Sequence, residues 1–235
     1  MEKEVLTKRI QEINEKIKNE CSEPENDRYP IYDGIVNVDE YLQTHPKILW
    51  ILKEAHDSVD EDGAPFGGDW SLADEFLNKD DFVEKRGKAS ATYDPIIYAS
   101  YGILYDKKLN EIPKIRENRE IANVIKKIAI INVSKLPGLT SSKNDKIAEA
   151  YKNCKDILLE QIALFDPDVI IGGYTMSLFE KDLGIEQLRD GTYGIPYAVK
   201  NGKVYIYTYH PAQTQMSHDE YVNGIIHIVQ NNLGK

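Results

Sequence analysis

Short, almost uninterrupted apolar runs separated by helical patterns constrain the fold of this chain more than any other feature. The segments KILWIL at 47–52 and KIAIINV at 127–133 are such runs, and they are typical of strands buried on both faces. Shorter runs predict two more strands, at Asp168–Ile171 and Val204–Tyr209. Helical segments between strands imply parallel crossovers. The sequence therefore predicts an α/β fold, a three-layer α/β/α sandwich around a central, mainly parallel four-stranded sheet.

Helical periodicity fills most of the remaining chain. In the first predicted helix, residues 3–19, the apolar side chains of Leu6, Ile10, Ile13 and Ile17 recur at helical spacing, and this helix is expected to cap the sheet. Further helices are predicted at 72–77, 95–105, 115–125, 145–164, 175–182 and 217–232, and a long loop at 57–69. The chain contains no internal repeat and no Gly/Ser linker, so we expect one domain over 1–235, with 1–46 as helical cap and lead-in.

Composition excludes several classes of protein. No apolar run approaches the ~20 residues that span a bilayer, and the N-terminal segment lacks the apolar core of a signal peptide, so we expect no membrane contact and a cytoplasmic location. Cys21 and Cys154 are too few for a disulfide framework, an all-cysteine zinc site or an iron–sulfur cluster held by four thiolates. The His-Asp pairs at 56–57 and 218–219 lack the spacing of metal ligands. We therefore expect no metal, no cofactor and no cysteine chemistry.

Charge is distributed unevenly along the chain, whose formal net charge is -10. Between Glu54 and Asp81 there are ten carboxylates and one lysine, whereas 82–146 carry thirteen Lys and Arg against seven Asp and Glu. The basic middle is available to a phosphate backbone, although a charge run is more often a solvated face. Charge alone therefore neither requires nor excludes a nucleic-acid partner.

Polar side chains follow the predicted strands at the point where each strand ends. Residues 53–57 (KEAHD) follow the first strand, Asn132 and 133–138 complete the second, and 210–213 (HPAQ) follow the last. In an open parallel sheet, ligands bind outside the carboxyl ends of the strands. A carboxylate, a carboxamide and an imidazole from three strands are therefore expected to converge on one crevice.

In order, these segments resemble motifs of the uracil-DNA glycosylase superfamily, especially its bacterial and archaeal branch that carries an iron–sulfur cluster. Five matches over roughly 47–215 carry the resemblance, and the first two are Glu54-Ala55-His56-Asp57 in the place of Gly-Glu-Ala-Pro-Gly and Gly63-Ala64-Pro65-Phe66-Gly67-Gly68 for Gly-x-Pro-Phe-x-Gly. The third and fourth are Ile131-Asn132-Val133-Ser134-Lys135-Leu136-Pro137 for Thr-Asn-Val-Val-Lys-x-Arg-Pro and Pro167-Asp168-Val169-Ile170-Ile171-Gly172-Gly173 for Pro-x-Val-Ile-x-x-x-Gly. The fifth is His210-Pro211-Ala212 for His-Pro-Ser or His-Pro-Ala. The resemblance implies a monomeric DNA glycosylase that hydrolyses the N-glycosidic bond of uracil, or of a related deaminated base, in DNA.

The chemistry of base excision explains these residue types. A flipped base must be stacked and hydrogen-bonded, and it must leave as an anion. The resemblance assigns stacking to Phe66 and base reading to the Asn132 amide, whose donor and acceptor match the edge of uracil. It assigns stabilisation of the leaving base to His210. A carboxylate would orient water and stabilise the cationic sugar, with Glu54 as first choice and Asp57 as second.

The resemblance also implies secondary contacts. Ala55 and His56 would line the base pocket, and contacts to DNA would come from Lys135, Pro211, Ala212 and Gln213. The chain departs from the family at Lys53 and His56, which replace a glycine and a proline, and it lacks the cluster's four cysteines.

Two other classes of function stay open. A superfamily member that acts on another base, a nucleoside or a nucleotide would keep the same residues and would tolerate the acidic segment. A non-catalytic binder of nucleic acid or of a protein would not need Glu54 or Asp57.

Overall fold

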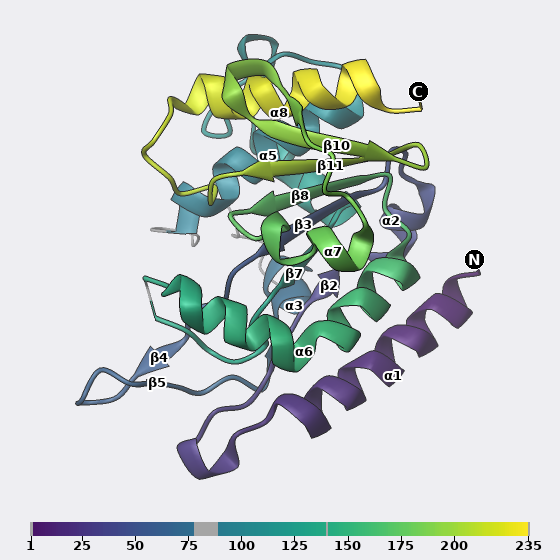
Figure 1. Cartoon of the computed structure of the whole chain (residues 1–235). Coiled ribbons are helices and arrows are strands. Elements are labelled where there is room, and N and C mark those ends of the chain that lie inside the picture. The colour runs from purple at the N-terminus through teal and green to yellow at the C-terminus, as the bar shows by residue number, and fades with distance from the viewer. Residues whose placement is uncertain (1, 78–88, 140, 235) are drawn as a thin grey trace.

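A mixed sheet runs through the computed structural model of this chain, which describes residues 2–77, 89–139 and 141–234 (Figure 1). From one edge to the other, its strands are β2 (Gly34–Ile35), β7 (Ala129–Asn132), β3 (Ile48–Leu52), β8 (Val169–Gly173), β11 (Lys203–Thr208), β10 (Pro196–Lys200) and β9 (Arg189–Asp190). β3 pairs in parallel with β7 and β8, and β8 pairs in parallel with β11. β2, β10 and β9 pair antiparallel. The α/β class is confirmed, and the sheet is wider and more mixed than the four strands predicted.

The hairpin of β10 and β11 accounts for part of this difference. It turns at Asn201 and Gly202, whose φ angles of 53° and 76° are the left-handed values that a two-residue hairpin turn requires. An Asn-Gly pair between apolar runs is a strong hairpin signal, so β10 was detectable in the sequence. β2 and β9 have two residues each, which is too short for an alternating pattern to reveal them.

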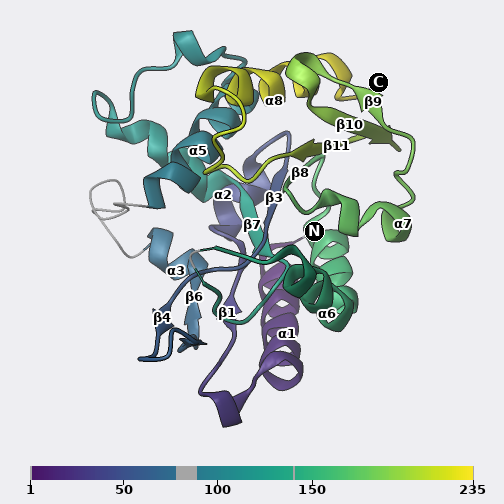
Figure 2. The same cartoon turned by 60° about the vertical axis from the view of Figure 1, so that its left-hand side comes forward.

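Helices cover both faces of the sheet (Figure 2). The α-helices are, in chain order, α1 (Lys3–Cys21), α2 (Val38–Gln43), α3 (Leu72–Leu77), α5 (Ser90–Tyr105), α6 (Asn144–Phe165), α7 (Glu180–Leu183) and α8 (His218–Asn232). The 3-10 helices are η1 (Pro24–Asn26), η3 (Leu109–Glu111), η4 (Arg119–Lys127), η5 (Met176–Leu178) and η6 (Thr192–Gly194). α1 and α6 pack on one face, and α3, α5 and α8 pack on the other.

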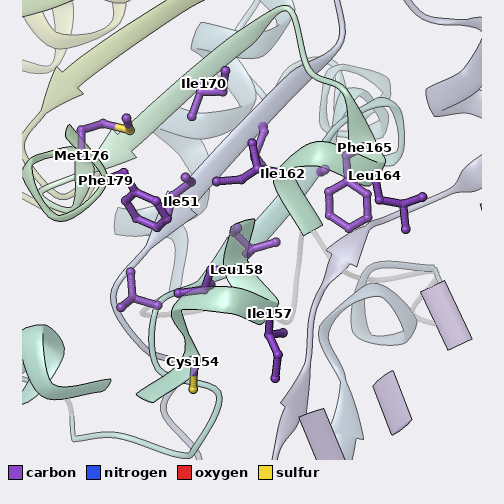
Figure 3. Close-up of a cluster of buried hydrophobic side chains, with 14 of the residues drawn as sticks. Ile51, Cys154, Ile157, Leu158, Ile162, Leu164, Phe165, Ile170, Met176 and Phe179 are labelled. Carbon is purple, nitrogen blue, oxygen red and sulfur yellow. The ribbon is translucent and has the colours of Figure 1, made fainter. Parts of the chain in front are cut away.

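Two apolar cores, one on each face, hold the layers together. On the α6 face, Ile51 and Ile170 of the sheet meet the side chains of Leu158 and Ile162 (Figure 3). On the opposite face Trp50 is fully buried, and its Nε1 donates to Ser100 Oγ at 3.1 Å, so its one polar group has a partner. All five residues of β3 are buried, as the continuous apolar run predicted.

Three predicted segments differ in detail from the structure. Residues predicted as a helix at 115–125 fall largely in η4. The buried residues Ile121 and Val124 are three residues apart, and this spacing suits the three residues per turn of a 3-10 helix as well as an α-helix. The helix predicted at 175–182 divides into η5 and α7. The predicted loop at 57–69 contains a small hairpin, β4 (Ser58–Val59) with β5 (Pro65–Phe66), and a further parallel pair joins β1 (Ile31–Tyr32) to β6 (Trp70–Ser71).

Among the described residues, no helix combines the length and the apolarity needed to cross a membrane.

Candidate active site

The loops that leave β3 and β7 are joined by hydrogen bonds at the carboxyl edge of the sheet. Backbone N–H groups of the second loop donate to carbonyl oxygens of the first, from Ser134 to Lys53 at 2.9 Å and from Gly138 to Ala55 at 2.8 Å. His56 Nδ1 lies 3.1 Å from the Gly138 carbonyl oxygen, and the ring is exposed. These hydrogen bonds join the two loops into one surface at the carboxyl edge, and both Ala55 and His56 contact Gly138 through them.

Glu54 lies on this surface, and its carboxylate is available to a ligand. A Cβ added at Gly138 would overlap the Glu54 carboxyl group, so the glycine allows the side chain to lie directly against the backbone. In the part of the chain that the structure describes, the Glu54 carboxylate has no hydrogen-bond partner. Of the two candidate carboxylates, Glu54 is therefore the one with acceptor capacity left for a water or a ligand.

Asp57 has a different role. Its Oδ2 accepts from the Gly68 N–H at 2.8 Å and from Trp70 Nε1 at 2.9 Å, and its Oδ1 accepts from Ser58 Oγ at 3.2 Å. Burial raises the pKa of Asp57, but the hydrogen bonds outweigh this effect and the pKa lies below its ordinary value. Asp57 therefore organises the 57–70 segment, and its oxygens are used within the protein.

His210 is half-buried beyond the end of β11, with one ring nitrogen already in use. Its Nδ1 accepts from the Ala212 N–H at 3.2 Å, so in the neutral ring the proton is on Nε2, which can donate to a ligand. Burial, followed by the charge of Lys53, lowers the pKa of His210. The imidazole is therefore a neutral donor at neutral pH.

The absence of a side chain at Gly173 brings the ends of three strands together. A Cβ there would lie 3.0 Å from Leu52 Cδ2, 3.1 Å from Pro211 Cδ and 3.6 Å from His210 Cα. Leu52 in turn is the register partner of Asn132 in the neighbouring strand. Asn132 at the end of β7, Leu52 at the end of β3, Gly173 at the end of β8 and His210 just beyond β11 therefore follow one another along the same edge.

Asn132 is 3% exposed. Its backbone N–H donates to Asp33 Oδ2 at 2.7 Å, whereas its carboxamide makes no hydrogen bond within the described part of the chain. Alternation along β7 places its side chain on the same face as Ile130, the face that α5 and α8 cover. Among the described residues only Arg28 Nε is a fully buried side-chain nitrogen or oxygen without a partner, so the unpartnered Asn132 amide keeps contact with solvent and is available to a ligand.

Lys135 does not suit the predicted contact with DNA. Its side chain is fully buried, and its Nζ lies 2.6 Å from Asp33 Oδ1 and 2.8 Å from Gln161 Oε1. The Gln161 amide also donates to the backbone oxygen of Asp33 and to its Oδ1, both at 3.1 Å. Lys135 thus belongs to a saturated core network that supports the β7 loop. No local sequence pattern identifies Asp33 or Gln161 as its partners.

The remaining predicted residues take varied positions. Phe66 is half-buried in β5, opposite Ser58. Pro211 is buried, Ala212 is exposed, and the Gln213 side chain is occupied by the backbone of 215–216. Gln213 therefore holds the turn into α8, and Ala212 is the exposed member of the group.

Lys53 is a site residue that the sequence does not reveal, because in the sequence it stands out only as a lysine in the place of a motif glycine. Its Nζ lies 4.7 Å from the centroid of the Tyr174 ring and donates to Asn144 Oδ1 at 3.0 Å. Tyr174 and Tyr209 are exposed rings with centroids 6.4 Å apart and planes inclined by 14°. The cation and the two rings come from the ends of β3, β8 and β11.

A cavity of about 570 Å³ opens beside these rings. Its lining comes from the start of α6, from the segment after β8 and from the ends of β10 and β11, and it includes Asn144, Tyr174, Thr175, Tyr207 and Tyr209. This volume is in the range of small-molecule sites. The cavity extends the carboxyl edge away from Asn132, towards β10.

The basic middle of the chain divides between two edges. Lys126 and Lys127 end η4 immediately before β7, so they lie at the amino edge, opposite the candidate site. Lys143 and Lys146 stand at the start of α6, beside the cavity lining. Residues 82–88 of the basic stretch lie outside the described residues. Only part of the predicted basic tract is therefore placed to meet a phosphate near the site.

In the described residues, no group of three or more His, Cys, Asp and Glu side chains is arranged to hold a metal ion. Comparison with known proteins assigns no family, because no family model and no curated protein matches the chain.

Proposed function

We propose that this chain hydrolyses the N-glycosidic bond between uracil, or a related deaminated base, and deoxyribose in DNA. The observation that carries the proposal is the buried Asn132 carboxamide, which has no partner among the described residues and stands at the carboxyl edge of the parallel strands. Its Oδ1 can accept from uracil N3–H while its Nδ2 donates to O4. A base at this position would give both polar atoms of the amide a hydrogen-bond partner.

The neighbouring groups supply the remaining chemistry. When the bond between uracil N1 and C1′ breaks, the electron pair leaves with the base, and His210 Nε2–H donates to the oxygen on which negative charge develops. The Glu54 carboxylate accepts a proton from the water that attacks C1′ and stabilises the cationic character of the sugar. Each role uses a group that the surrounding protein leaves available.

Single carboxylate variants provide the test. The purified chain is incubated with labelled single- and double-stranded oligonucleotides that carry one uracil, and abasic sites are then cleaved by alkali. We expect Glu54→Gln to lower the rate of excision by about 10²–10⁴-fold. Glu61→Gln, which changes an exposed carboxylate of the same acidic segment, is the control and should excise at the wild-type rate. If the wild-type chain excised the base from neither the single-stranded nor the double-stranded oligonucleotide, the proposal would be rejected.

Base choice gives an independent readout. Asn132→Asp presents a carboxyl group in place of the amide donor, so its recognition should extend towards cytosine. An unchanged preference for uracil in this variant would exclude Asn132 as the group that reads the base.

A second candidate substrate is a free nucleoside or nucleotide, and two observations favour it. The 570 Å³ cavity beside Tyr174 and Tyr209 is of suitable size, and Lys126 and Lys127 lie at the opposite edge from the site. A small substrate needs no basic track. Release of free base from deoxyuridine or its monophosphate, without release from the oligonucleotides, would favour this candidate.

A further inference from the structure

The two cysteines of the chain lie side by side, although they are far apart in sequence. Cys21 is the last residue of α1 and Cys154 lies in the first half of α6, and their Sγ atoms are 3.3 Å apart. α1 and α6 run next to each other over the same face of the sheet (Figure 1). Ion pairs from Arg9 and Lys16 to Glu160, at 3.2 and 2.6 Å, fix the two helices relative to each other.

The surroundings favour a thiolate on Cys154. The hydrogen bond from the Cys21 thiol lowers the pKa of Cys154, burial opposes this effect, and the Lys135 ammonium and backbone N–H lower it further. The same contact raises the pKa of Cys21. Cys154 is therefore the sulfur that loses its proton more readily, and the Cys21 sulfur lies in contact with it at 3.3 Å.

Access to the pair is limited but present. Cys154 is 7% exposed, and Cys21 is half-buried at the end of its helix. The chain continues from Cys21 through Ser22 in extended conformation, so the end of α1 is not enclosed by a further helical turn. Cys21 is therefore the more exposed member of the pair, and only a small oxidant suits so restricted a site.

We propose that Cys21 and Cys154 form a redox pair, which a small hydroperoxide oxidises to an intramolecular disulfide and a dithiol returns to two thiols. The Cys154 thiolate attacks the terminal O–H oxygen of the peroxide, which keeps its hydrogen, the O–O bond breaks, and the alkoxide or hydroxide leaves and takes a proton from water, giving a sulfenic acid at Cys154. The Cys21 sulfur then attacks the Cys154 sulfur, and the S–O bond breaks to release water. Each sulfur loses one electron and the peroxide gains two.

The pair is connected to the candidate active site through Lys135. Lys135 contributes charge and a backbone N–H to Cys154, and through Asp33 it belongs to the network that also binds the backbone of Asn132. Formation of the disulfide removes the negative sulfur from this network and ties α1 covalently to α6.

The test uses the full chain, reduced and freed of reductant, then exposed to one equivalent of hydrogen peroxide. Thiols are counted after denaturation, and linked peptides are identified by mass spectrometry. We expect both thiols to disappear, a single peptide pair joining Cys21 to Cys154, and a Tm that rises by roughly 4–16 °C and returns after treatment with a dithiol. The Cys21→Ser and Cys154→Ser variants should form no intramolecular link.

Other outcomes overturn the proposal. These are retention of both thiols at one equivalent of peroxide, oxidation to sulfinic acid without a link, or links between chains alone. Cys21→Ala and Cys154→Ala provide a second pair of variants should a serine at either position prevent folding. Peroxide should leave the Tm of every single variant unchanged.

Discussion

Two polar clusters meet at Asn132, and they differ in how completely their hydrogen-bonding groups are used. The first is the buried network of Asp33, Lys135 and Gln161, in which every charged group has a partner at 2.6–3.1 Å. The second is the edge cluster of Glu54, Asn132 and His210, in which a carboxylate, an amide and an imidazole Nε2 have no partner in the described part of the chain. Asn132 belongs to both, through its backbone N–H and its side chain respectively.

The difference separates groups that maintain the fold from groups that are available for chemistry. A buried charge is tolerated only when it is paired, so the first network cannot give up a bond without loss of stability. The groups of the edge cluster keep free hydrogen-bonding capacity, and a ligand can use it without breaking a bond of the fold. Variants of the first cluster should therefore change stability, and variants of the second should change activity.

The largest effect is expected for Lys135→Met, which leaves the Asp33 carboxylate buried without a counter-charge. The free energy of unfolding should fall by about 3–5 kcal/mol, as measured by urea denaturation. Lys3→Met is the matched control, because Lys3 also lies 2.6 Å from an aspartate, Asp39, but both groups are exposed. Exposed pairs contribute little, so the control should unfold at nearly the wild-type urea concentration. Equal stability of the two variants would contradict the distinction between the clusters.

His210→Ala should affect activity and leave stability nearly unchanged. Loss of one preorganised donor to the leaving base should lower the excision rate by about 10²–10³-fold. His218→Ala, which removes an exposed imidazole at the start of α8, is the control and should excise normally. A His210→Ala variant with full activity would remove this residue from the site.

The pH dependence of stability provides a smaller effect. The pKa of His210 is lowered in the folded chain, so below its ordinary pKa of 6.5 the unfolded chain binds a proton that the folded chain resists. The free energy of unfolding should therefore decrease as the pH falls from about 7 towards the folded pKa. The difference between wild type and His210→Gln isolates this contribution, and a difference that does not change with pH would contradict it.

The smallest effect is expected for Lys53→Met. Burial is the larger cause of the lowered His210 pKa and the charge of Lys53 the smaller, so the variant should raise this pKa without restoring its ordinary value. An NMR titration of the imidazole measures the change. An unchanged or lower pKa would show that Lys53 does not act on His210.

The sequence predicted the parts of the fold that depend on local pattern. β3, β7, β8 and β11 are apolar runs, and α1, α6 and α8 have clear helical periodicity, so their positions agree with the structure to within a few residues. The two-residue strands lack a period that could be recognised. The position of a residue after a strand was predictable, but the direction of its side chain was not.

Lys135 and Lys53 illustrate that limit. A basic residue after a strand suggested a contact with phosphate, yet Lys135 is paired with Asp33, 102 residues away. In the sequence Lys53 differs from a motif glycine and shows nothing more, whereas its Nζ lies over the ring of Tyr174, which follows another strand. Such partners are set by tertiary packing, which no local pattern contains.

The position of β3 within the sheet has a consequence for biosynthesis. In the register of β3 with β7, Leu49 pairs with Ala129, which follows 80 residues later, and with β8 it pairs with Ile170, a further 41 residues on. At ribosomal rates of about 5–20 residues per second, the most apolar strand emerges roughly 4–16 s before its first long partner. The central strand of the sheet must therefore remain unpaired during much of synthesis, which makes KILWIL the segment of the nascent chain that most needs protection from aggregation.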